Sequence, residues 1–93
     1  MREKVIEQAL FRAVLKHGGL CLKFVSPGYA GMPDRLVLMP GGKLAFVEVK
    51  APGEKPRPLQ VHMHAQLRIL GFDVYVIDCR QQIPEVIYAL LSS

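Results

Sequence analysis

The chain has 93 residues, 51% of them hydrophobic, and its 12 basic and 8 acidic residues give a formal net charge of +4. This length leaves room for one hydrophobic core, so we expect a single domain over residues 1–93, and the apolar content excludes a disordered chain. The apolar runs end well before the ~18 residues of a membrane helix, and acidic residues stand near the N-terminus where a secretory signal needs an apolar run. We therefore expect a cytoplasmic protein with no membrane partner. The surplus of basic residues permits a polyanionic partner without identifying one.

The first third of the sequence predicts a helix and a short strand. From Glu3 to His17 apolar residues recur at helical spacing, and a pair of glycines then ends the helix. The apolar positions of this helix are Ile6, Ala9, Leu10, Ala13 and Val14. Residues 20–25 have the composition of a strand, and the turn-rich residues 26–33 end it.

The middle of the sequence predicts a β-hairpin. Two apolar runs, residues 34–39 and 43–50, are separated by Pro40-Gly41-Gly42. The number of residues in the loop decides which side chains of the two strands share a face of the sheet.

The remaining sequence predicts a helix, a strand and a second helix. Residues 51–58 contain three prolines and form a loop, from which Pro58 opens a helix. We expect this helix, residues 58–70, to bury an apolar stripe. The members of that stripe are Leu59, Met63, Leu67 and Leu70. A strand over residues 72–78 and a short C-terminal helix over residues 84–91 follow.

The order of elements is therefore αβββαβα. Local antiparallel strands precede a helix that crosses over to a further strand. We predict an α/β fold in which helices flank a mixed sheet.

Two charged residues, Glu48 and Lys50, lie two apart at the end of a predicted strand, so their side chains leave the same face. The strand is otherwise apolar on both faces, which is the pattern of a central, buried strand. A charged pair at the end of such a strand is costly unless something compensates it. An ordinary ion pair at a strand end is the alternative interpretation.

Asp34 opens the other strand of the hairpin, directly after Gly31-Met32-Pro33. Its alternative interpretation is a turn aspartate that binds local backbone. The three-residue loop, however, sets Asp34 directly opposite Glu48 on one face. Two neighbouring carboxylates repel, so either one of them binds a proton or a divalent cation lies between them. Oxygen ligands favour a hard ion such as Mg²⁺ or Mn²⁺.

A third carboxylate, Glu7, falls on the margin of the apolar stripe of the first helix, whereas Lys4, Arg12 and Lys16 project away. A glutamate at the edge of the core needs a partner. The alternative is a glutamate stabilised by the positive end of the helix dipole.

Together these residues resemble the active site of the PD-(D/E)XK nuclease superfamily, and the longer string resembles its VRR-NUC family. The matching segments are Gly31-Met32-Pro33-Asp34, Val47-Glu48-Val49-Lys50-Ala51-Pro52-Gly53 and Gln60 at the start of the next helix. The resemblance extends over nearly the whole chain, and the restriction-endonuclease-like αβββαβ core of the superfamily matches the element order predicted above. The superfamily signature alone is loose, but the longer string, its spacing and Gln60 make the match specific.

The resemblance implies a role for each matching residue. Asp34 and Glu48 would be ligands of Mg²⁺ or Mn²⁺, with the backbone carbonyl of Val49 as a further ligand. Lys50 would orient or activate the attacking water. A metal held by two carboxylates would also neutralise charge that builds on the phosphate. Whether one or two ions bind stays open.

Two helix residues complete the implied site. Glu7 corresponds to the helix glutamate that contacts the metal directly or through water. Gln60 corresponds to the helix residue that supports the site. Met63 stands where relatives often carry an aromatic residue, which leaves base stacking at this position without support.

Four side chains near this site are candidates for contacts to nucleic acid. Lys55 and Arg57 flank it from a Pro-rich loop and suit phosphate contacts, with a merely solvated loop as the alternative. Tyr29 suits stacking on a base, or else packs on the fold. His64, one helical turn from Gln60, is expected at the surface, where it could touch phosphate.

The cysteines and histidines predict no further chemistry. Cys21 and Cys79 lie in apolar runs, and we expect buried free thiols rather than a disulfide. His62 and His64 face differently, His17 ends another helix, and no histidine or cysteine cluster has the spacing of a zinc site. We expect neither zinc nor a small organic cofactor.

The sequence thus predicts a Mg²⁺- or Mn²⁺-dependent endonuclease of the VRR-NUC type that hydrolyses DNA phosphodiesters. The resemblance implies that members made of the nuclease domain alone act as dimers on branched DNA such as four-way junctions. The surface of the helix over residues 58–70 and five C-terminal residues offer apolar area for such a homodimer. The five residues are Val86, Ile87, Tyr88, Leu90 and Leu91. The alternatives are a non-catalytic nucleic-acid-binding module and a basic domain that binds proteins, although no site residue is missing. No residue can be assigned to sensing a 2′-hydroxyl, so DNA and RNA are not separated.

Overall fold

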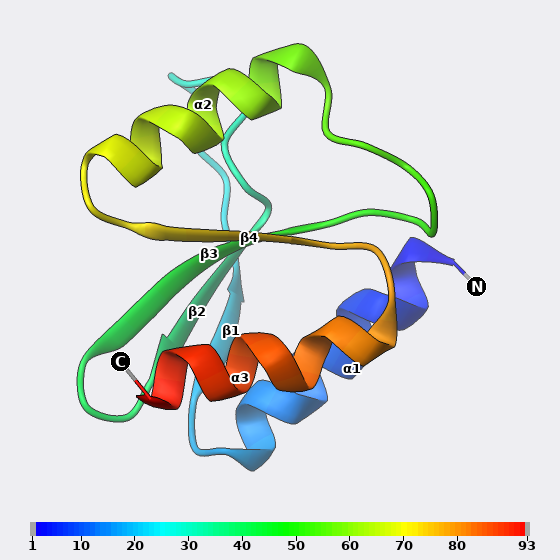
Figure 1. Cartoon of the computed structure of the whole chain (residues 1–93), viewed down its shortest axis with the longest axis vertical. Helices are drawn as coiled ribbons and strands as arrows, with labels where there is room; N and C mark the ends of the chain where they lie inside the picture. The colour runs from blue at the N-terminus through cyan, green and yellow to red at the C-terminus, as the bar shows by residue number, and fades with distance from the viewer. Residues whose placement is uncertain (1, 93) are drawn as a thin grey trace.

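A four-stranded sheet lies between helices in the computed structural model, which describes residues 2–92 (Figure 1). The elements in chain order are α1 (Glu3–Lys16), β1 (Leu20–Lys23), β2 (Arg35–Met39), β3 (Lys43–Val49), α2 (Pro58–Ile69), β4 (Asp73–Ile77), the short 3-10 helix η1 (Arg80–Gln82) and α3 (Ile83–Ser92). Helices α1 and α3 cover one face of the sheet, and α2 covers the other. The predicted αβββαβα order and the α/β fold are confirmed.

The sheet is mixed and has the strand order β1-β2-β3-β4. Strand β2 pairs antiparallel with both β1 and β3, whereas β4 lies parallel to β3. Helix α2 makes the crossover that a parallel pair requires. Strand β3 is therefore central, as its two apolar faces predicted. The boundaries of the elements differ from the predicted ones by one or two residues, and η1 is an additional turn.

A three-residue loop joins β2 to β3, and its length fixes the register of the hairpin. Residues 40–42 form the loop, and its two glycines have φ angles of 85° and 75°. Glycine adopts such positive φ angles without steric cost. Arg35 pairs with Val47, so the preceding Asp34 comes to lie opposite Glu48. The predicted loop and register are confirmed.

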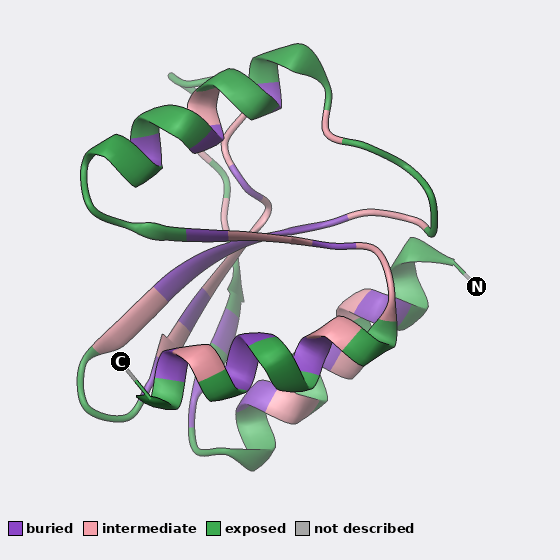
Figure 2. Ribbon diagram, viewed as in Figure 1, coloured by how far each residue is buried: buried purple, intermediate pink, exposed green. Residues whose placement is uncertain are grey.

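Hydrophobic side chains form a core on each face of the sheet. Figure 2 marks the buried residues in purple along the strands and helices. The larger core lies between the sheet and helices α1 and α3. Its buried members include Ile6, Leu10, Val14, Val37, Ala45, Val47, Val49, Ile87 and Leu90. The smaller core, under α2, centres on Phe46, Leu67 and Val74. The alternation of side chains along β3 divides the two cores, because successive residues point to opposite faces.

Helix α2 buries only part of the predicted apolar stripe. Leu59 is 53% exposed and Leu70 is 72% exposed, although both belong to the predicted stripe. The buried residues of α2 are Gln60, His64 and Leu67, at the spacing of one helical face. The predicted stripe is therefore wrong at Leu59 and Leu70, whereas Leu67 is buried as predicted. Two polar residues face inward because the sheet beneath them carries a charged side chain at the end of β3.

The C-terminal helix α3 packs most of its apolar residues into the larger core. Val86, Ile87 and Leu90 are buried, whereas Tyr88 and Leu91 are exposed. Three of the five residues that we expected at a dimer surface therefore lie inside the fold.

Both cysteines are free, as predicted. Cys21 is buried, and Cys79 is partly buried, so the second thiol is less enclosed than expected. None of the helices that residues 2–92 form is long and apolar enough to cross a membrane.

Replacing Leu10 by alanine tests the larger core. Leu10 is fully buried, so Leu10→Ala should lower the free energy of unfolding by about 2–5 kcal/mol, through lost burial and the cavity that remains. Leu15 lies on the same helix but is 55% exposed, and Leu15→Ala should cost less than about 1 kcal/mol. Denaturant unfolding of both variants measures the difference. Equal losses would contradict the faces assigned to α1.

Candidate active site

The carboxylate of Glu48 is buried at the end of β3. Glu48 is 3% exposed, and the other buried polar residues of the described chain are Gln60 and His64. These three side chains meet between the sheet and α2. A buried carboxylate is costly unless donors or charges compensate it, so the neighbours of Glu48 decide what the site can do.

Two donors reach the same oxygen of Glu48. Gln60 Nε2 donates to Glu48 Oε2 over 3.1 Å, and Lys50 Nζ lies 3.5 Å from that oxygen. The other oxygen, Oε1, has no hydrogen-bond partner, and His64 Nε2 lies 3.7 Å from it. Glu48 and Lys50 therefore share a face, as predicted. Their ion pair is enclosed, because the two side chains are only 5% and 13% exposed.

Gln60 holds the Glu48 carboxylate against the start of α2. Its Oε1 accepts a hydrogen bond from the N–H of Arg57 over 2.8 Å, while its Nε2 donates to Glu48. With the acceptor and the donor of the amide both in use, the side chain has a defined orientation. This contact fits the supporting role that was predicted for Gln60.

The loop before Asp34 packs against the same end of α2. A Cβ atom added to Gly31 would lie 2.7 Å from the carbonyl oxygen of Leu59, and Gly31 has a φ of +88°. The close approach and the positive φ both require glycine. Gly31 therefore lets the loop that carries Asp34 touch the helix that carries Gln60.

Asp34 is fixed at the end of the hairpin by backbone contacts. Its Oδ1 accepts a hydrogen bond from the N–H of Val49 over 3.3 Å. Its own carbonyl accepts one from the N–H of Phe24 over 2.9 Å. The register sets this half-buried side chain on the face of Glu48.

The electrostatics of the two carboxylates favour a cation. Burial raises the pKa of Glu48, the negative charge of Asp34 raises it further, and Lys50 lowers it. Burial also raises the pKa of Asp34, which the Val49 N–H lowers and the charge of Glu7 raises. A divalent cation between two such carboxylates removes the cost of ionising both. The buried, unpartnered Oε1 of Glu48 supplies an acceptor, so these residues fit a hard cation.

Glu7 pairs with Arg35 over 3.1 Å. In this conformation, residues 2–92 contain no group of three or more His, Cys, Asp or Glu arranged to hold a metal. Strand parity explains the pairing, because Arg35 follows Asp34 and points to the face that α1 covers. The nuclease motif does not include Arg35. The alternation of side chains along β2 is the signal that could have identified Arg35 as the partner of Glu7. The role of Glu7 as a metal ligand stays a prediction.

His64 is buried, and its expected surface position is wrong. It is 2% exposed and faces Glu48 from α2, one turn after Gln60. Burial lowers the pKa of His64 from its ordinary 6.5, and the charges of Arg68 and Lys50 lower it further, which favours the neutral imidazole. A buried imidazole offers no contact to an outside phosphate. The spacing of four residues from Gln60 is the signal that places both on one face.

The backbone of β3 continues past Glu48 into the site. Val49 pairs with Ile77 of β4, and the N–H of Lys50 donates to the carbonyl of Ile77 over 2.9 Å. These contacts hold the main chain between the two charged side chains. The role of the Val49 carbonyl as a metal ligand stays a prediction.

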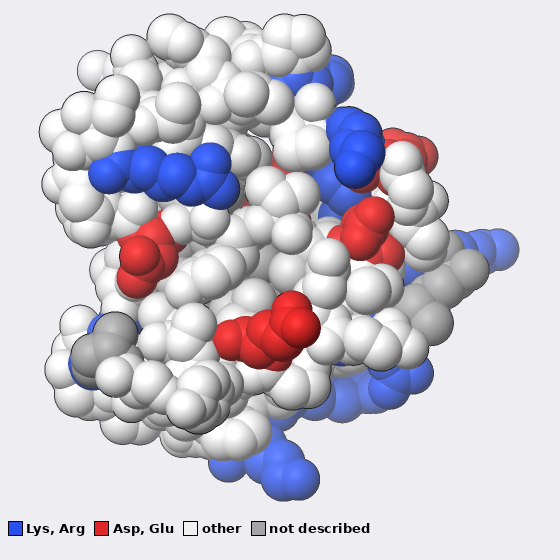
Figure 3. Space-filling model, viewed as in Figure 1, with Lys and Arg blue, Asp and Glu red and all other residues white. Residues whose placement is uncertain are grey.

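The loop side chains expected to contact nucleic acid are exposed. Lys55 and Arg57 are exposed in the loop before α2, and Tyr29 is 66% exposed. Arg57 lies next to the site, because its N–H binds Gln60. Basic and acidic side chains are interspersed on the face seen in Figure 3. The exposure permits contacts to phosphates and bases, and the contacts themselves stay predictions.

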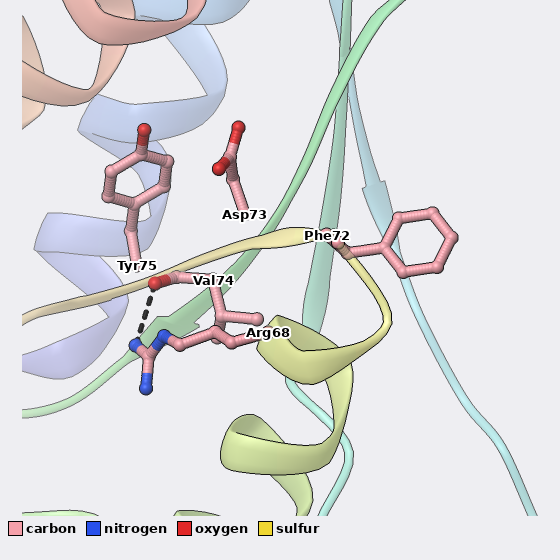
Figure 4. A pocket seen from close by; sticks show the side chains of 6 residues that line it. Arg68, Phe72, Asp73, Val74 and Tyr75 are labelled. Carbon is pink, nitrogen blue, oxygen red and sulfur yellow. Dashed lines mark hydrogen bonds between the residues drawn. The ribbon is translucent and has the colours of Figure 1, made fainter.

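A separate hollow of about 260 Å³ lies beside β4 (Figure 4). Its lining residues are Arg68, Gly71, Phe72, Asp73, Val74 and Tyr75. Arg68 Nη2 donates to the carbonyl of Val74 over 2.7 Å (Figure 4). Asp73 pairs in register with Ala45, three residues before Glu48. The hollow thus contains none of the predicted site residues.

Comparisons with known proteins agree over most of the chain. "Putative nuclease p44" of Acyrthosiphon pisum secondary endosymbiont phage 1 is 56% identical over 78 residues, which are 84% of this chain and 84% of that protein. A solved structure of a "VRR_NUC domain" is similar with a TM-score of 0.86 at 34% identity, and the match covers 91% of this chain and 92% of that chain. No family model matches the chain.

Replacing Glu48 by glutamine tests how far the buried charge of Glu48 destabilises the folded protein. The raised pKa means that the folded protein, free of divalent ions, loses stability as pH rises from the ordinary glutamate value of 4.5 through the pKa of folded Glu48. Glu48→Gln removes this loss, so at pH 8 the variant should unfold at a higher temperature than the wild type. The advantage should shrink towards pH 4. Thermal unfolding in EDTA measures it, with the exposed Glu85→Gln as control.

A Glu48→Gln variant that unfolds below the wild type at pH 8, or an equal gain in Glu85→Gln, would contradict this assignment.

Proposed function

The chain belongs to the VRR-NUC family, and from this premise we propose that it is a divalent-metal-dependent endonuclease that hydrolyses phosphodiester bonds of DNA. The observation that carries the proposal is the buried carboxylate of Glu48, set opposite Asp34 and within reach of Lys50. A buried and a half-buried carboxylate beside a lysine, in a nuclease family, have a direct use in phosphodiester hydrolysis. The similarity to the phage nuclease supports the same conclusion.

Asp34 and Glu48 would hold Mg²⁺ or Mn²⁺, together with the carbonyl of Val49 and, directly or through water, Glu7. Their oxygens are the ligand type that these ions prefer. When bound, the ion supplies positive charge that stabilises the transition state on the phosphate and makes water easier to deprotonate. To bind the ion, Glu7 would have to break its ion pair with Arg35.

Lys50 would orient the attacking water and stabilise negative charge on the phosphate. Its ammonium group already lies 3.5 Å from Glu48 Oε2, at the same end of β3. Gln60 would keep the Glu48 carboxylate in place through its two hydrogen bonds. A preorganised charge of this kind acts mainly on the transition state and little on substrate binding.

Lys55, Arg57 and Tyr29 would bind the DNA around the site. Their exposure beside the start of α2 and in the loop before Asp34 supports this role. Lysine and arginine neutralise phosphates, and tyrosine stacks on bases. Such contacts bind nucleic acid without selecting a sequence.

We further propose that residues 1–93 act as one nuclease domain and that two copies form a homodimer on branched DNA. Exposed apolar residues gather at the end of α2, where Ile69 is 84% and Leu70 is 72% exposed. Neighbouring exposed apolar side chains are typical of an association surface. A two-fold dimer would present two active sites to the paired strands of a junction.

Cleavage of a DNA panel tests the activity. Linear, flap, single-stranded and four-way DNA should be cut in Mg²⁺ or Mn²⁺ and left intact in EDTA, with the four-way DNA cut fastest. Asp34→Asn and Glu48→Gln should each lower the rate by roughly 10²-fold or more, because each removes a ligand of the ion. Asp73→Asn, an exposed aspartate outside the site, should cut like the wild type.

Cleavage in EDTA, or full activity of either site variant, would overturn the metal assignment. DNA binding without any cleavage would favour a non-catalytic binding module.

Lys50 and the loop cations should separate catalysis from binding. Lys50→Ala should lower cleavage by roughly 10²–10³-fold and leave DNA affinity nearly unchanged. The double variant Lys55→Ala, Arg57→Ala should weaken binding and reduce the slope of log affinity against log salt by about two. Binding titrations at several salt concentrations and single-turnover cleavage measure both. A parallel loss of binding and cleavage in Lys50→Ala would make Lys50 a docking residue instead.

Light scattering tests the dimer. At micromolar concentration the wild type should have twice the mass of the chain, and Leu70→Lys should shift it towards the monomer by burying a charge in the interface. Val25 is 73% exposed in a loop, so Val25→Lys is a matched control that should remain dimeric. A monomeric wild type would contradict the dimer and the paired cutting of junction strands.

A further inference from the structure

Two buried polar atoms without partners face each other in the active site. They are Glu48 Oε1 and His64 Nε2, which lie 3.7 Å apart, and their side chains are 5% and 2% exposed. In the described part of the chain, these are the buried side-chain nitrogen and oxygen atoms that lack a hydrogen-bond partner. Buried polar groups are almost always hydrogen-bonded. Two neighbouring buried atoms without partners therefore need an explanation.

The other donors around Glu48 do not serve this oxygen. Gln60 Nε2 and Lys50 Nζ both lie near Oε2. The imidazole of His64 is thus the donor available to Oε1, at a distance just beyond the hydrogen-bond range of about 2.7–3.2 Å. Catalytic hydrogen bonds are often long in the unliganded state and shorten when a site is loaded.

The tautomer of His64 follows from its surroundings. A neutral imidazole carries one N–H, on either Nδ1 or Nε2. With the proton on Nδ1, two acceptors would face each other inside the protein, which is unfavourable. With the proton on Nε2, a donor faces the Glu48 acceptor, so this tautomer is the stable one.

We propose that His64 is a positioning residue for the metal-binding carboxylate, in which Nε2–H donates to Glu48 Oε1. Glu48 is then held from α2 on both of its oxygens, by Gln60 on one and by His64, a turn later, on the other. The inference rests on the proposed function, because the orientation of Glu48 matters when this carboxylate binds an ion.

Holding both oxygens leaves Glu48 able to bind a cation. Each carboxylate oxygen has two lone pairs, so one donor on each leaves acceptor capacity on both. A carboxylate that is already oriented loses less freedom when the ion arrives. Loss of such an outer hydrogen bond typically costs roughly 10- to 100-fold in metal affinity.

The tautomer can be measured without any substitution. Long-range ¹H–¹⁵N correlation spectra of the wild-type protein in EDTA should show that His64 carries its proton on Nε2. A proton on Nδ1 overturns the donor role. Because it uses the wild-type protein, this measurement tests the proposal even if a variant of His64 fails to fold.

Calorimetric titration with Mn²⁺ alone, without DNA, tests the consequence. His64→Leu should lower the Mn²⁺ affinity roughly 10- to 100-fold, and His64→Gln, whose amide can donate from a similar position, should restore most of it. His62 is exposed on the same helix, so His62→Leu should bind like the wild type. In a Glu48→Gln background, His64→Leu should have no further effect, because the two act as a unit.

The outcomes separate the two proposals. If Glu48→Gln abolishes binding but His64→Leu binds Mn²⁺ as the wild type does, the positioning role is overturned and the metal site stands. A lower melting temperature with unchanged affinity would show a structural role only. If Glu48→Gln binds Mn²⁺ like the wild type, the metal site fails, and the role of His64 fails with it.

Discussion

The constraint on which the site depends is one buried carboxylate. Glu48 ends a central strand and is 3% exposed, so its charge is separated from the water that would otherwise stabilise it. Lys50 and Gln60 compensate one oxygen, and Asp34 adds a second negative charge opposite. A protein built for stability alone would place an apolar residue here. Under the proposed function, a bound cation would compensate the charges of both carboxylates.

The first turns of α2 hold the Glu48 carboxylate in place. The helix turns Gln60 and His64 towards the sheet, where Glu48 lies, and leaves Leu59 and Leu70 exposed. Gly31 allows the loop before Asp34 to reach the backbone of the same helical turn. Glu48 and the loop that carries Asp34 therefore both contact the start of α2, although Glu48 lies in β3 and Asp34 precedes β2. Such support is what keeps a binding geometry accurate.

The sequence predicted the hairpin better than the helix beside it. Side chains alternate strictly along strands, so a three-residue loop was enough to set Asp34 opposite Glu48. In α2 the predicted stripe includes Leu59 and Leu70, both of which are exposed, whereas polar residues occupy part of the buried face. Which face of α2 is buried depends on its tertiary contact with the sheet, and the helix sequence alone does not show that contact. For the same reason a local pattern could not distinguish a surface histidine from the buried His64.

The proposed function requires Asp34 and Glu48 to hold one divalent cation together. Anomalous diffraction from crystals soaked in Mn²⁺ tests it most directly, because the signal locates the ion independently of activity. We predict a peak within roughly 2.0–2.6 Å of carboxylate oxygens from both Asp34 and Glu48. A peak bound elsewhere, or no peak between these carboxylates at saturating Mn²⁺, would contradict the account.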